Sequence, residues 1–122
     1  MTAEELFESY PKAADAITKY YNEVFMSTLN NQEVPEEFKE LAKAQMVDQQ
    51  YVKQFIDMNP RGTWDAFDAH KIYIEITVIV GDPVFFIYHV DGEVNSAPPY
   101  EKRLDAERAA LEKAFQKLND KL

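Results

Sequence analysis

Apolar residues recur every three or four positions through the first half of the chain, which is the spacing of one helix face. We expect a short helix at 3–9, a helix of about five turns that begins at Pro11 and is ended by residues 30–32, and a third that begins at Pro35. A fourth runs from an N-cap at Asp48 to Asn59-Pro60. The residues expected to face the core from the last three helices are Ala14, Ile17, Tyr21, Val24, Phe25, Leu29, Phe38, Leu41, Ala42, Met46, Tyr51, Val52, Phe55 and Ile56.

The period changes to two in residues 72–80, which predicts a strand. Residues 84–91 form its antiparallel partner, and a shared apolar face places Glu75 opposite His89. Because Pro83 cannot take a positive φ, the usual three-residue loop is unavailable, and we expect a five-residue connection. The side chains expected on the core face are Ile72, Ile74, Ile76, Val78, Val80, Val84, Phe86, Tyr88 and Val90.

Two strands alone are barely stable, so a third short strand is expected within residues 93–103. The last helix is expected from Leu104 to Lys121, and Thr63 is expected to cap a single helical turn before the hairpin. The predicted fold is α+β in a single domain, 1–122: N-terminal helices, then an antiparallel hairpin or three-stranded sheet, with a C-terminal helix packed on the sheet. That helix covers the sheet with Leu104, Leu111, Ala114, Phe115 and Leu118.

Composition excludes several kinds of chemistry. The 122 residues include no cysteine, which rules out disulfides, zinc-thiolate sites and a catalytic cysteine. Three glycines cannot build a glycine-rich phosphate loop, and the apolar runs are too short to cross a membrane. The first residues lack the basic flank and apolar stretch of a signal peptide. We therefore expect a cytoplasmic protein with no cofactor, no bound metal and no membrane partner.

The formal charge of −9 is unevenly distributed. Residues 1–60 contribute −6 and residues 61–98 contribute −4, whereas residues 99–122 contribute +1. An acidic surface opposes binding to nucleic acid, whose affinity depends on Lys and Arg. It is typical of a solubilising surface. The alternative is an inhibitor that imitates the phosphate array of a nucleic acid and so binds a DNA- or RNA-binding protein.

Three groups of residues suggest chemistry and are weighed against simpler explanations. Asp57, Asp65, Asp68 and His70 could hold a divalent cation in a metal-dependent enzyme, but their spacing matches no known binding loop, and a solvated acidic turn is favoured. Glu75 and His89 could act as an acid and a base, yet no nucleophile accompanies them, and a cross-strand charge pair is favoured.

The third and fourth helices have the order of a helix-turn-helix with a turn near Met46-Val47. Glutamines on the fourth helix could contact adenine edges, but Lys53 is almost the only base nearby. We therefore expect no nucleic acid partner.

The strand pattern leaves aromatic and aliphatic residues on the sheet face away from the core. Such a face is either covered by another element or is a contact surface. We expect a non-enzymatic accessory protein that binds another protein or forms a homodimer. The residues predicted to bind the partner are Tyr73, Glu75, Ile79, Phe85, Ile87 and His89.

Two stretches carry a family resemblance: residues 4–13 (EELFESYPKA) and residues 102–115 (KRLDAERAALEKAF). They resemble small uncharacterised proteins of phages and mobile elements of gut bacteria, which often end in a strand, an R-x-E-A-E-x-A helix start and a Phe/Leu-rich helix. Asp105 stands here where the pattern has Glu. The resemblance covers about a fifth of the chain and implies a phage-derived origin, with no activity or site residues to carry over.

Overall fold

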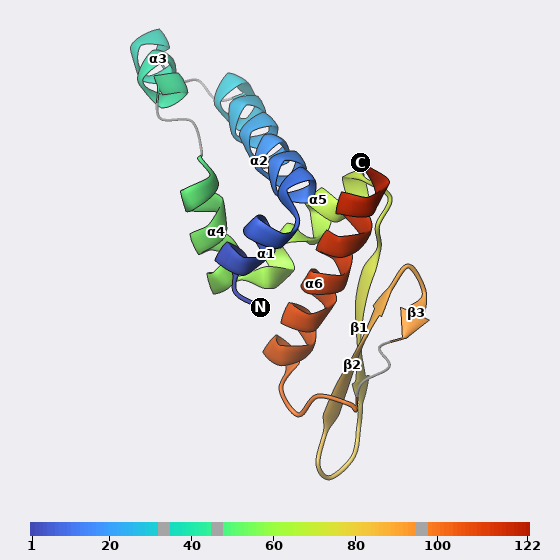
Figure 1. Cartoon of the computed structure of the whole chain (residues 1–122). Coiled ribbons are helices and arrows are strands. Elements are labelled where there is room, and N and C mark those ends of the chain that lie inside the picture. Colours follow the sequence, from blue (N-terminus) through green and yellow to red (C-terminus); the bar gives the residue numbers. More distant parts are fainter. Residues whose placement is uncertain (32–34, 45–47, 95–97) are drawn as a thin grey trace.

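Helices and a small sheet form two layers, in the order expected from the sequence (Figure 1). The computed structural model describes the backbone of residues 1–31, 35–44, 48–94 and 98–122, and the side chains of these residues except 29–31 and 41–44. The elements are α1 (Ala3–Ser9), α2 (Pro11–Asn31), α3 (Glu36–Ala44), α4 (Gln49–Met58), a 3-10 turn η1 (Pro60–Thr63), α5 (Trp64–Ala69), β1 (Ile74–Ile79), β2 (Phe85–Val90), β3 (Glu93–Val94) and α6 (Arg103–Lys121).

The core lies between α6 and the helices that precede the sheet. Phe115 of α6 is fully buried, and its ring lies 5.9 Å from the ring of Phe7 in α1 and 5.4 Å from that of Phe67 in α5. The opposite side of α6 packs on the sheet, mainly on β2. Because α6 contacts both layers, its buried face is wide, and it includes Ala106, Ala110, Leu111, Ala114, Phe115 and Leu118.

Side chains from distant parts of the chain cap the N-termini of the first two helices. Thr2 and Glu5 form a capping box at α1, and the Asp57 carboxylate accepts a hydrogen bond of 2.9 Å from the Ala3 amide. The Asn119 side-chain oxygen in α6 accepts hydrogen bonds from the amides of Lys12 and Ala13, at 2.9 and 3.2 Å. The last helix therefore satisfies amides that α2 leaves free at its start.

The sheet has the predicted register and connection. β1 and β2 are antiparallel with Glu75 opposite His89 and Thr77 opposite Ile87, and residues 80–84 form the five-residue connection. β3 pairs with β2, so the strand order is β1-β2-β3. Tyr100 adds an isolated bridge to Phe86 on the same side of β2.

The arm formed by the end of α2 and by α3 extends away from this core (Figure 1). Burial was predicted for Val24, Phe38 and Tyr51, and this is wrong: Val24 is exposed, and Phe38 and Tyr51 are 60% and 58% exposed. The helical periodicity was correct, but α2 is about 30 Å long and passes the edge of the core. Leu29, Leu41, Ala42 and Met46, and the turn near Met46-Val47, lie outside the described side chains and residues.

The far end of the hairpin also leaves the core. Val78, Val80 and Val84 are exposed although they were expected inside, and Val80 is 86% exposed. Leu104, in the first turn of α6, is likewise exposed. The hairpin continues past the point where α6 covers it (Figure 1). The alternation of apolar and polar residues therefore predicts burial at positions that the helix does not reach.

A further correction concerns Thr63, whose hydroxyl donates to the Pro60 carbonyl at 2.7 Å and makes no capping bond to α5. The 3-10 turn η1 also contacts the place where α2 packs against α4. The Tyr21 hydroxyl donates to the Gly62 carbonyl at 3.1 Å, and its ring meets Phe55 edge-on. Burial is the main cause that raises the pKa of Tyr21 above its ordinary value, so the phenol stays neutral.

Gly62→Ala tests how tightly this junction is packed. A Cβ at Gly62 would lie 2.8 Å from two ring atoms of Phe55, so the ring must shift, and we expect a loss of about 1–3 kcal/mol in the free energy of unfolding. Denaturant titration measures it. Gly81→Ala is the matched control, because the nearest atom to its Cβ is 3.4 Å away in an exposed loop. Equal stability of the two variants would contradict a packed junction.

Candidate functional site: the outer face of the hairpin

The base of the hairpin is fixed by a tight turn and by two links. Asp91 and Gly92 have φ values of 54° and 80°, which suit the two-residue turn that joins β2 to β3. The Asp91 carboxylate accepts a 2.9 Å hydrogen bond from the Tyr73 amide and lies 3.7 Å from the Lys117 ammonium of α6. Asp91 therefore joins both strands to the helix beneath them.

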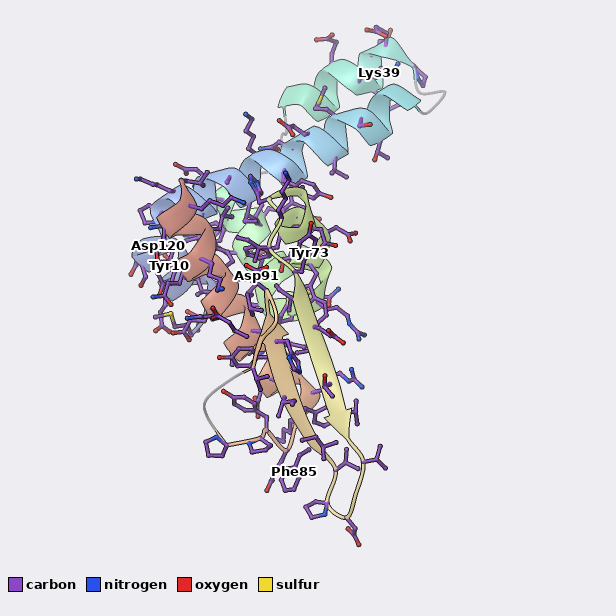
Figure 2. All side chains as sticks on the ribbon, turned by 90° about the vertical axis from the view of Figure 1, so that its right-hand side faces the viewer. Tyr10, Lys39, Tyr73, Phe85, Asp91 and Asp120 are labelled. Atoms are coloured by element: carbon purple, nitrogen blue, oxygen red, sulfur yellow. The ribbon has the colours of Figure 1, made fainter. Side chains whose placement is uncertain are left out.

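The six residues predicted to bind a partner come together on one side of the sheet, here called the outer face: Tyr73, Glu75, Ile79, Phe85, Ile87 and His89. Five of them are odd-numbered residues of two paired strands, Tyr73 directly precedes β1 in the same alternation, and Thr77 shares the face. Their side chains therefore leave the sheet on the side opposite to buried Val90. Figure 2 shows Tyr73 near the base of the hairpin and Phe85 near its far end.

No described helix covers the outer face: all the described helices lie on the opposite side of the sheet (Figures 1 and 2). Tyr73 and Ile79 are 58% and 40% exposed, Glu75 is exposed, and Phe85, Ile87 and His89 are half-buried. Cross-strand neighbours account for the half-burial, since Phe85 stands opposite Ile79 and Ile87 opposite Thr77. The face is therefore apolar at its far end and polar at the Glu75–His89 step.

Glu75 and His89 face each other as predicted, but they do not form the expected charge pair. Their Cα positions are partners in the register, yet no ion pair within 4.0 Å joins them among the contacts of the described residues. Their neighbours on the same face of the paired strands are Thr77 and Ile87, and neither is a second histidine. The pair belongs to the polar part of the outer face, between Tyr73 at the base of the hairpin and the apolar residues toward its far end.

The acidic residues considered for a metal site are not brought together. Asp57 caps α1 through the Ala3 amide, Asp65 and Asp68 are exposed on α5, and the His70 carbonyl accepts a 2.6 Å hydrogen bond from Lys121. Within residues 1–31, 35–44, 48–94 and 98–122, no group of three or more His, Asp or Glu side chains is placed to hold a metal ion.

An open hollow at the start of α1 is lined by Met1, Thr2, Glu5, Asp57 and Arg108. Both of its acidic side chains already serve the helix: Glu5 accepts from Thr2, and Asp57 accepts from Ala3. Capping of α1 therefore accounts for both carboxylates of the hollow.

Comparison with known proteins adds no relative: no family model, curated protein or solved structure matches the chain. Among the described helices, none is long and apolar enough to cross a bilayer.

Sequence reasoning missed two features next to the outer face. One is the exposed far end of the hairpin, with Val78, Val80 and Val84. The other is the free edge of β1, which is the first strand in the sheet order. The run of branched residues from Ile72 to Val80 carries both signals, because it extends beyond the part of the hairpin that α6 covers.

Asp91→Ala tests the base of the hairpin. Alanine loses the hydrogen bond to Tyr73 and is strained at a positive φ, so we expect a loss of about 2 kcal/mol in the free energy of unfolding. Asp91→Asn keeps an oxygen acceptor and tolerates this φ, and loses only an ion pair worth less than about 1 kcal/mol. Thermal or denaturant unfolding compares the two; equal losses would show that Asp91 acts through its charge.

Proposed function

We propose that this chain is a non-enzymatic accessory protein that binds a partner protein through the outer face of its hairpin. The observation that carries the proposal is the set of apolar side chains on that face, which no described helix covers. Contact surfaces are distinguished by aromatic and aliphatic side chains with few charges at their centre. Ile79, Phe85 and Ile87 form such a centre, while Tyr73, Glu75 and His89 supply a polar border.

The stability of the hairpin does not require this face to be apolar. The core side of the sheet already packs on α6 through buried Val90 and half-buried Ile74, Ile76 and Tyr88. In an antiparallel sheet with one face on the core, residues alternate along each strand, and those on the solvent-exposed face are usually polar. Apolar residues at positions that contribute little to the core support a role in contact.

The acidic surface offers a weaker basis for function. Glu36 and Glu37 stand in the first turn of α3, where the helix dipole favours carboxylates, and Lys19 lies 4.0 Å from Glu23. These acids have local structural explanations, so the proposal does not use them. A cytoplasmic location and a phage-derived origin belong to the proposal, the first resting on the absence of cysteine.

Phe85→Glu tests the proposal. The immobilised chain is used to capture partners from a lysate of its host, and we expect a specific partner to be lost with Phe85→Glu, because a carboxylate would be buried in the contact. Met58→Glu is the matched control: Met58 is an apolar residue, 84% exposed, on α4. Circular dichroism checks that both variants fold.

The salt dependence of capture separates the two kinds of contact. An apolar contact persists in high salt, whereas attraction by the acidic surface weakens steeply. Capture that survives Phe85→Glu contradicts the proposal. The proposal is also contradicted if capture disappears in high salt while neither Phe85→Glu nor Met58→Glu changes it at low salt.

A further inference from the structure

β1 is an edge strand, and no strand among the described residues pairs with its free side. It is first in the order β1-β2-β3, and its contacts are with β2 and, to a smaller extent, with α6. Figure 2 shows no described element beside β1 on the side away from β2. An exposed edge is a template for another strand unless charged side chains, Pro or a bulge block it. Ile74–Ile79 contains no Pro and pairs with β2 without a bulge, and Glu75 is its one charged residue.

Three backbone hydrogen bonds show which groups of β1 face the free edge. The Asp91 amide donates to the Tyr73 carbonyl at 2.8 Å, so Tyr73 turns its backbone toward β2. Phe86, opposite Val78, turns its amide and carbonyl away from β1, toward Tyr100, at 2.7 and 2.8 Å. Since backbone direction alternates along a strand, Ile74, Ile76 and Val78 direct their N–H and C=O groups to the free edge.

The edge of β1 is complementary to the same edge in a second copy of the chain, and its side chains favour one register of that pairing. A closed dimer pairs β1 with β1 antiparallel about a two-fold axis, and the free groups must face each other. With the axis at Ile76, Ile74 faces Val78 of the second copy and all the free backbone groups of the strand are bonded. Glu75 then stands opposite Thr77 of the second copy.

This register has two neighbours, with the axis at Glu75 or at Thr77. With the axis at Thr77, Ile74 would have to pair with Val80 of the second copy, which lies beyond the end of β1. Charge disfavours the other neighbour. With the axis at Glu75, two Glu75 carboxylates would stand directly opposite each other, which is unfavourable. With the axis at Ile76, no like charges are opposed on either face, and Tyr73 meets Ile79 of the second copy. Because α6 packs mainly on β2, it leaves the β1 side of the sheet open for the second copy.

We propose that two copies of this chain associate through their β1 edges, about a two-fold axis at Ile76, to form one continuous six-stranded sheet. The proposal deepens the proposed function, because the dimer joins two outer faces into a single larger contact surface. It uses backbone groups and Thr77, which the test of the outer face does not alter.

Charge variants at Thr77 test the interface and its register together. Thr77→Glu places two like-charge pairs across the axis, and we expect the dimer dissociation constant to rise about tenfold; Thr77→Lys places two opposite-charge pairs there, and we expect it to fall. Sedimentation velocity from micromolar to near-millimolar concentration measures both. Gln116→Glu and Gln116→Lys, at an exposed position on α6, repeat the charge changes away from the edge and should leave the constant unchanged.

A disulfide provides a second measurement, since the chain has no cysteine of its own. Glu75→Cys chains mixed with Thr77→Cys chains should form a mixed disulfide dimer under mild oxidation, whereas each variant alone should form far less. Circular dichroism of every variant confirms that it folds.

The outcomes separate this proposal from the proposed function. A wild-type chain that stays monomeric at the highest concentration overturns the dimer. Equal effects of Thr77→Glu and Thr77→Lys, or disulfides in the single variants alone, overturn the register. Phe85→Glu should leave the dimer intact. Loss of partner capture with an unchanged dimer supports both the outer-face contact and the β1-edge dimer. Unchanged capture with an intact dimer contradicts only the outer-face proposal.

Discussion

The fold depends on the packing of one helix against two layers. Phe115 of α6 meets Phe7 and Phe67 on the helical side, while the same helix contacts β2 on the other. A two-stranded hairpin is at best marginally stable in water, and β3 adds only two residues to it, so the stability of the sheet comes from this contact. The buried residues gather where α6 covers them, whereas exposed apolar residues lie past it, at Val78, Val80 and Val84 in the hairpin and at Val24 and Phe38 in the arm.

This dependence explains which features the sequence could predict. Helix positions, strand register and the five-residue connection follow from local signals such as Pro11, Asp48, Pro83 and the alternation of apolar residues. Those signals act over a few residues, and the structure agrees with them. Glu75 and His89 were placed opposite each other because burial of one face allows a single register.

Burial was harder to predict, because it depends on how far one element extends over another. Val24 and Val80 each continue a correct apolar pattern, yet both lie beyond the end of the cover. Local periodicity cannot report the length of a neighbouring element. The same limit hid the free edge of β1, since strand order is set by the turn at Asp91-Gly92, which places β3 beside β2 and leaves β1 outermost.

The Asn119 cap on α2 has a consequence for how the chain folds as it is made. Residues 12 and 13 leave the ribosome more than a hundred positions before their hydrogen-bond acceptor does. Until α6 has emerged, the start of α2 lacks this cap and the Phe7 and Phe67 rings lack Phe115. Long-range contacts of this kind slow folding. The N-terminal helices therefore gain this cap and these ring contacts only once α6 has been synthesised.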